Sequence, residues 1–310
     1  MSRSDAGLVD IVREFLLAHR ELHRLFERHR QGTLRWEEVQ RLVGGDEASV
    51  LFRLKERSHA LFRGANAGAE LPRVALFDLA VGSLFHEAMK LRENFYQLEV
   101  YAPKVEAARS DAEPGSEALF DEFARILRAS RTRLEEALGE SESLLEQTRR
   151  QFRVLLAAHR ENGFVARYLL ENASLAEEVL GEPLDALFAS IHGDAVAGYA
   201  LAARSYLESG HFDEARRALA EASARDPAQP ALRAATSYAE GMSSWLHGDY
   251  ERALDQLEHW AGQPHAPEDA RFRELALAAI SRLGQLVEGE SAATLSARAS
   301  ALGRTLAAAR

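Results

Sequence analysis

The chain has 310 residues, a net charge of −10, 46% apolar residues and 28% charged residues. This balance is that of a folded globular protein, and it argues against a disordered chain and against a general nucleic-acid coat. Cysteine is absent, which excludes disulfides, thiolate metal sites and cysteine nucleophiles. No apolar run approaches the length of a membrane span and no signal-peptide core opens the chain, so we expect a cytoplasmic protein.

The residues between the few prolines are mostly Ala, Leu, Glu and Arg, which are strong helix formers. No run alternates with the period of two that marks a strand, so the predicted fold class is all-α. We expect a multi-helix N-terminal region at 1–195 and a helical repeat module with a C-terminal cap at 196–310. The proline-bearing stretch 102–115 is predicted to be an exposed loop and a sub-boundary within the N-terminal region.

Apolar residues at helical spacing predict N-terminal helices over 5–31, 34–43 and 47–63, the third capped by Asp46. A longer helix is expected from about 72 to 101. Its predicted buried side consists of apolar residues: Leu76, Leu79, Leu84, Ala88, Leu91, Phe95 and Leu98. The same spacing indicates that these helices bury one stripe each against a shared core.

From 116 onward apolar residues recur at a near-heptad spacing, which predicts one very long helix or two helices broken near Gly139. Three hydroxyl residues fall on or near this seam: Ser130, Ser141 and Thr148. They make the seam a weak coiled coil by itself. We therefore expect antiparallel packing against the helix at 76–101.

The segment 199–227 has the most informative spacing. Gly210 separates two helical runs, where a chain reversal requires a residue that tolerates positive φ. Asp226 precedes Pro227, and the residue before a proline is excluded from the α region, so the second run ends there. Aromatic, small and large residues share the predicted packing faces: Tyr199, Ala202, Ala203, Tyr206, Phe212, Ala215, Leu219 and Ala222.

This pattern resembles the tetratricopeptide repeat family, in which an aromatic, a small pair and a Tyr precede a small–large–small series and a closing Pro. The chain departs from it by alanines at the usual Leu and Gly positions and by Leu219 at a usual aromatic. A degenerate second copy follows at an offset of 248 − 210 = 38 residues, against a family period of about 34. Its matching residues are Gly241, Gly248, Tyr250, Ala253 and Leu257. Helices at about 268–283 and 291–309 are expected to cap the array.

The resemblance implies a non-catalytic adaptor or scaffold that holds a partner protein in a groove lined by the first helix of each repeat. The matching outward positions are Arg204, Leu207, Tyr238, Met242 and Trp245. This surface is apolar with one arginine, so the expected partner is an apolar or amphipathic segment with an acidic group near Arg204. The alternative is that the chain's own N-terminal helices fill the groove.

A second hypothesis is a transcriptional regulator with a helix-turn-helix at 34–63. Its second helix carries three basic residues that would face DNA: Arg53, Lys55 and Arg57. Asp46 and Glu47 argue against this, because they place acid at the start of the would-be recognition helix, where base contacts are usually made.

A third hypothesis is a helical metal-dependent enzyme. His19 and His23 share a helix face, but the order H-x-E-x-H is not that of zinc proteases, and we expect an exposed, solvated pair. His86 and Glu87 lack the facing Glu-x-x-His motif that di-metal bundles use. No nucleotide-binding, hydrolase or kinase motif is present, so the sequence predicts no catalytic residue, metal site or cofactor.

Overall fold

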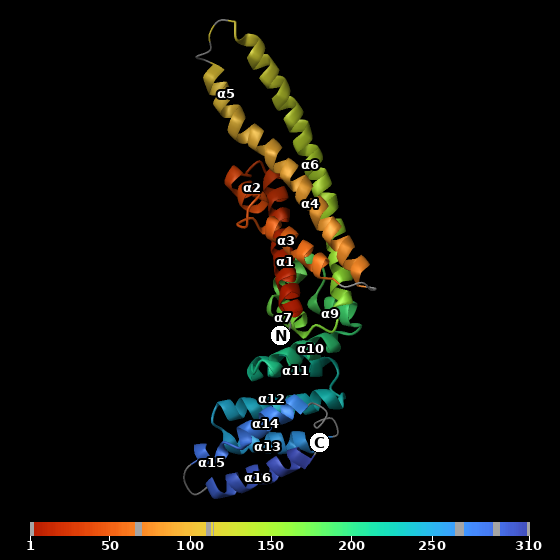
Figure 1. Cartoon of the computed structure of the whole chain (residues 1–310), viewed down its shortest axis with the longest axis vertical. Coiled ribbons are helices and arrows are strands. Elements are labelled where there is room, and N and C mark those ends of the chain that lie inside the picture. The colour runs from red at the N-terminus through yellow and green to blue at the C-terminus, as the bar shows by residue number, and fades with distance from the viewer. Residues whose placement is uncertain are drawn as a thin grey trace. The chain divides into compact units, whose positions relative to one another are not determined.

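A computed structural model of the chain describes residues 3–65, 70–109, 113, 115–263, 270–287 and 292–308. Within these ranges all regular secondary structure is helical (Figure 1). The predicted all-α fold class is confirmed.

The chain divides into two compact units, one formed by 1–160 with 174–182 and the other by 161–173 with 183–310. The first unit holds α1 (Arg3–Arg30), α2 (Trp36–Val43), α3 (Val50–Gly64), α4 (Leu71–Tyr96), the π-helical segment η1 (Gln97–Tyr101), α5 (Ala102–Arg109), α6 (Glu117–Ala158) and nearly all of α8 (Ala173–Leu180). The second unit holds α7 (Gly163–Glu171), α9 (Leu184–His192), α10 (Ala195–Glu208), α11 (Phe212–Arg225), α12 (Pro230–Leu246), α13 (Tyr250–Ala261), α14 (Ala270–Ile280), α15 (Leu283–Leu286) and α16 (Ala292–Ala308).

The core of the first unit is built around three phenylalanines from three helices. Phe15 of α1 and Phe152 of α6 lie almost parallel, with ring centroids 3.8 Å apart and planes 12° apart. Phe77 of α4 contacts both, at 6.1 and 6.0 Å. All three side chains are buried, so α1, α4 and α6 share one hydrophobic core.

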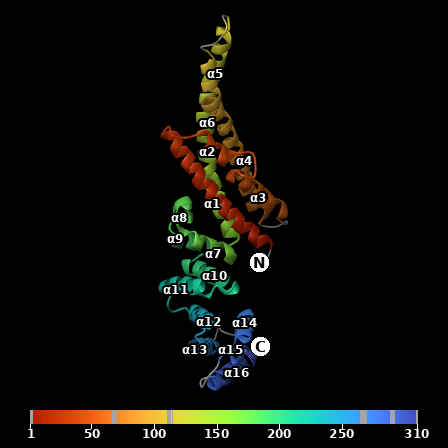
Figure 2. The same cartoon turned by 90° about the vertical axis from the view of Figure 1, so that its left-hand side faces the viewer.

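The long helix α6 is continuous through Gly139 and runs antiparallel beside α4 (Figures 1 and 2). The prediction of antiparallel packing is therefore confirmed. The three seam hydroxyls are fully buried: Ser130, Ser141 and Thr148. Ser130 and Thr148 satisfy their hydroxyl groups by donating to helix carbonyls four residues back, at 3.1 and 2.6 Å.

The predicted buried side of α4 is wrong at two leucines. Leu76 and Leu79 are 51% and 66% exposed, because the buried face of α4 instead follows Val74, Phe77 and Val81. The reason is geometric: these positions continue the stripe through Leu84 and Ala88 at steps of three and four residues, and Leu76 and Leu79 do not.

Ser49, and not Asp46, caps α3. The Ser49 hydroxyl accepts from the Phe52 amide at 3.3 Å and donates to the Leu42 carbonyl at 2.7 Å. Asp46 accepts from the Ala48 amide instead, at 3.1 Å, within the turn before the helix.

Residues 102–109 of the expected loop are helical as α5. The helix passes Pro103 because the preceding η1 segment widens to a π-turn, in which the Ala102 amide bonds the Gln97 carbonyl. Pro103 then falls in the first turn of α5, where its missing N–H costs little. The rest of the expected loop is described only at 113 and 115.

In the second unit α10 pairs with α11, α12 pairs with α13, and α11 packs on α12 (Figure 1). α16 packs against α13, α14 and α15. The core thus extends through successive helix pairs, each of which buries the apolar face of its neighbour.

Candidate functional site

The helical hairpin α10–α11 is held by the residues that carry the repeat pattern. The buried residues of this pattern on α10 and α11 are Tyr199, Ala202, Ala203, Tyr206, Phe212, Ala215, Leu219 and Ala222. The small residues permit close approach of the helix axes, and the aromatic and leucine side chains fill the space that remains. α11 ends at Arg225, and Asp226 lies outside the α region (φ −137°, ψ 87°) before Pro227, as predicted.

The two hairpins close with the same hydrogen bonds at an offset of 38 residues. Gly210 and Gly248 both have positive φ, 77° and 79°. In the first turn the His211 amide bonds the Tyr206 carbonyl at 2.9 Å, and 38 residues later the Asp249 amide bonds the Ser244 carbonyl at 3.0 Å. This six-to-one bond around a left-handed glycine is the Schellman closure, and it reverses the chain identically in both pairs.

The second hairpin, α12–α13, is packed more closely than its degenerate sequence suggests. A Cβ at Gly241 would lie 2.7 Å from Cγ of Leu257 and 3.2 Å from the Ala253 carbonyl, so only glycine fits between the helices. Ala253 and Leu257 are fully buried. Tyr250, at the start of α13, is half-buried.

Three of the five predicted groove residues point into the core. Leu207, Tyr238 and Met242 are 3%, 1% and 6% exposed, so the prediction that they point outward is wrong. Tyr238 lies between Trp260, at 4.9 Å between ring centroids, and Phe272, at 5.0 Å. Phe272 belongs to α14, so the helix expected to cap the array covers this part of the surface.

The other two predicted groove residues remain accessible. The Arg204 side chain is 61% exposed and bonds Glu208, one turn later, at 3.1 Å. Trp245 is half-buried and meets the Tyr250 ring at 5.0 Å, nearly edge-on. Next to it Leu246 is 65% exposed, a residue that sequence analysis missed although it follows Trp245 off the buried face of α12.

Two tyrosines of α10 tie it to neighbouring helices. The Tyr199 hydroxyl donates to Asp185 of α9 at 2.8 Å, and the Tyr206 hydroxyl donates to Glu171 of α7 at 3.0 Å. Burial, with these carboxylates nearby, raises the pKa of both tyrosines to about 12. Arg167 lies over the Tyr206 ring at 4.4 Å. These contacts fix the orientation of α10 within the second unit.

The three basic residues of α3 that the DNA hypothesis places against DNA contact other side chains of the first unit. Arg53 donates to Glu14 of α1 at 3.1 Å, and Arg57 donates to Asp10 at 2.7 Å. Lys55 lies 5.0 Å from the Phe85 ring centroid. The two arginines thus hold α3 against α1, and Lys55 lies beside α4.

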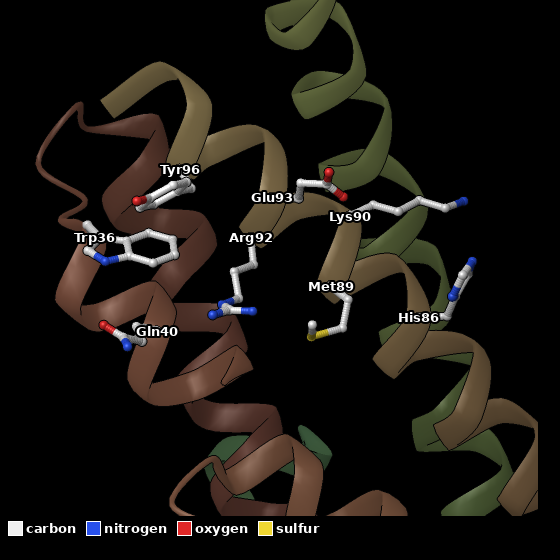
Figure 3. A pocket seen from close by; sticks show the side chains of 8 residues that line it. All are labelled: Trp36, Gln40, His86, Met89, Lys90, Arg92, Glu93 and Tyr96. Atoms are coloured by element: carbon white, nitrogen blue, oxygen red, sulfur yellow. The ribbon is translucent and has the colours of Figure 1, made fainter. Parts of the chain in front are cut away.

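A hollow of about 600 Å³ lies between α2 and α4. Its lining residues are Trp36, Gln40, His86, Met89, Lys90, Arg92, Glu93 and Tyr96. Figure 3 shows Arg92 and Met89 pointing toward α2, whereas Lys90 and His86 point away from it. The ring centroids of Trp36 and Tyr96 are 4.7 Å apart.

Arg92 is the distinctive group of this hollow. Its guanidinium carbon lies 5.6 Å from the Trp36 ring centroid, and its Nε is buried without a hydrogen-bond partner among the described residues. No carboxylate in the described part of the chain forms an ion pair with Arg92. Sequence analysis missed this site, although Arg92 and Tyr96 share a face of α4 that lies outside its buried stripe and could have indicated it. The hollow can therefore accept an anionic group beside an aromatic surface.

Glu87 and the nearby Asn94 make local bonds on α4. Glu87 pairs with Lys90 at 2.6 Å, and the Asn94 amide donates to the Lys90 carbonyl at 2.8 Å. His86 is exposed on the same helix. Glu87 and Asn94 are thus bonded within α4 itself.

Comparison with protein-family models, curated proteins and solved structures gives no match. Within the described residues no single helix is long and apolar enough to cross a membrane; α9 and α10 meet that test only as a pair, with a bend of 89° between them.

Proposed function

We propose that this chain is a non-catalytic, cytoplasmic adaptor that binds another protein, with a second unit of tetratricopeptide-like hairpins. The 38-residue repetition of the turn bonds and the buried framework of α10–α13 support the repeat-like interpretation. Such stacked hairpins present side chains on a rigid scaffold, which lowers the entropy lost on binding. The cysteine-free composition favours a reducing compartment.

The observation that carries the proposal is the hollow of Trp36, Arg92 and Tyr96. Tryptophan, tyrosine and arginine are the residue types that contribute most to protein–protein binding energy, and here they converge in a concave site. Arg92 has no acidic partner among the described residues, so a partner carboxylate would be its ion pair. The expected ligand is a protein segment with an apolar or aromatic side chain next to an acidic one.

The accessible residues of the repeat module form a second contact surface. Trp245, Leu246 and Tyr250 place apolar area at the α12–α13 turn, and Arg204 adds an exposed positive charge on α10. Of the five groove residues predicted from the sequence, Arg204 and Trp245 are accessible, and Leu246 is a further accessible residue of this surface. An amphipathic segment with an acidic group remains the partner that this surface fits.

Affinity capture from host lysate, quantified by mass spectrometry, tests the proposal with the full-length chain. We would compare the wild type with Trp36→Ala/Arg92→Gln and with Trp245→Ala/Leu246→Ser. Leu119→Ser is the matched control, because Leu119 is 73% exposed on α6 and belongs to neither surface. Circular dichroism would establish that each variant is folded.

The expected result is at least one protein that the control retains and the Trp36/Arg92 variant loses. Loss with the Trp245/Leu246 variant alone would place the partner on the repeat module. A set of captured proteins unchanged by both double variants would overturn the proposal. Capture that nuclease and salt abolish would favour the DNA hypothesis instead.

A further inference from the structure

Two histidines of α1 and a glutamate of α6 come together in the first unit. His19 and His23 lie one turn apart, with ring centroids separated by 5.1 Å. One ring nitrogen of each histidine and one carboxylate oxygen of Glu146 all lie within 4.8 Å of one another. α6 thus supplies the third ligand-type side chain that the H-x-E-x-H segment lacks by itself.

His19 is not the solvated residue that the sequence suggested. It is 1% exposed, because α6 packs on α1 through the Phe15–Phe152 stack, and the Phe15 ring centroid is 5.8 Å from that of His19. A neutral imidazole offers a nitrogen lone pair to a cation. Its Nδ1 is buried without a hydrogen-bond partner among the described residues.

The guanidinium of Arg149 already contacts both His19 and Glu146. Arg149 donates through Nε to Nε2 of His19 at 3.2 Å, and its Nη2 lies 2.8 Å from the Glu146 carboxylate. One guanidinium therefore takes up both the lone pair of His19 and the charge of Glu146. A divalent ion has a higher charge density than a guanidinium and would compete for the same two groups.

We propose that His19, His23 and Glu146 bind a divalent ion of the zinc class, and that Arg149 competes with the ion. Two imidazole nitrogens and one carboxylate oxygen are a ligand set that Zn²⁺ accepts at about 2.0–2.2 Å, with a fourth tetrahedral position left for solvent. In such a tetrahedron the ligand atoms lie roughly 3.3 Å apart. His23 and Glu146 are exposed, so their side chains can rotate and bring their ligand atoms from within 4.8 Å of His19 to the shorter spacing that the ion requires.

The test is calorimetric titration of the untagged full-length chain with Zn²⁺ after dialysis against a chelator. We expect one ion per chain and a Tm that rises with Zn²⁺ concentration. His23→Ala and Glu146→Gln, both at exposed positions, should each weaken the affinity by roughly tenfold or more. Arg149→Met should strengthen it, because the competing cation is removed.

His29→Ala is the matched control. His29 also lies on α1 and faces a glutamate of α6, Glu135, at 3.7 Å, but has no third ligand-type side chain with it among the described residues. This variant should bind Zn²⁺ as the wild type does. Zn²⁺ affinity that is unchanged in His23→Ala and Glu146→Gln, or that falls in Arg149→Met, would overturn the proposal. So would the absence of measurable binding by the wild type.

Discussion

Arg225 holds Asp185 through both arms of its guanidinium. Nε of Arg225 donates to Oδ2 at 2.9 Å and Nη2 donates to Oδ1 at 2.7 Å. The same guanidinium stacks over the Tyr199 ring at 4.3 Å. The pair joins the last turn of α11 to the first turn of α9, 40 residues earlier in the chain. Its planar, two-pronged geometry is available to arginine and not to lysine.

Arg225→Lys should therefore lower the free energy of unfolding by about 1 kcal/mol, because a lysine keeps the charge but loses the paired hydrogen bonds and the ring contact. Urea denaturation measures the difference. Arg217→Lys is the control. Arg217 is 77% exposed and its ion pair with Glu214 is long at 3.7 Å, so its replacement should have no measurable effect on stability. Equal effects at both positions would show that the two-pronged pair contributes nothing.

Tyr206 gives a prediction for alkaline pH. Burial, and next the charge of Glu171, raise its pKa to about 12, against about 10 in an unfolded chain. Above pH 10 the unfolded state releases this proton while the folded state keeps it, so stability is complete below pH 10 and declines as the pH rises toward 12.

Tyr206→Phe removes that ionisation, so the variant should lose less stability than the wild type between pH 9 and pH 11. The comparison of the two urea midpoints at each pH isolates Tyr206 from the other groups that titrate there. Parallel losses in the two proteins would contradict the prediction.

Gly241 and Gly139 form a matched pair of helix glycines. A Cβ at Gly241 would meet Leu257 at 2.7 Å, so Gly241→Ala should destabilise the chain by roughly 1–3 kcal/mol through overpacking. A Cβ at Gly139 would meet nothing within 4 Å, and Gly139→Ala should stabilise α6 by about 0.5–1 kcal/mol through helix propensity. Thermal unfolding of both variants measures the contrast. Changes of the same sign would show that the α12–α13 contact is looser than described.

We expect the arginines of α3 to stabilise the folded chain. Glu14 is 4% exposed, and Arg53 is its partner at 3.1 Å, with Arg57 at 3.9 Å. Arg53→Gln with Arg57→Gln leaves this buried carboxylate without its α3 partners, which should cost roughly 2–4 kcal/mol. Lys55→Gln, beside the exposed Glu56, should cost little.

Heparin chromatography separates this role from DNA binding. If Arg53 and Arg57 act only on stability, the folded double variant should elute at the same salt concentration as the wild type. A salt-dependent retention that the double variant loses would support the helix-turn-helix hypothesis.

Local sequence patterns predicted much of the helical hairpin architecture. Gly210 and Gly248 tolerate the left-handed turn, and Pro227 excludes its predecessor from the α region; each effect acts within a few residues. Helix periodicity likewise placed Ala215 and Leu219 on a buried face. These predictions succeeded because backbone sterics and one apolar stripe determine them.

The accessibility of the sites depended on contacts between residues far apart in the chain. Tyr238 is buried because Phe272 packs on it, and His19 is buried because α6 packs beside α1. Trp36 and Arg92 form one hollow although 56 residues separate them, since 92 − 36 = 56.

The sequence by itself thus determined that this chain is helical, where its hairpins turn and which residues have a helix-compatible apolar face. Only the tertiary structure decided which of those faces a second helix covers. Helix periodicity states that a face is apolar, but the identity of its covering partner depends on side chains packed from distant segments, and no local pattern contains that information.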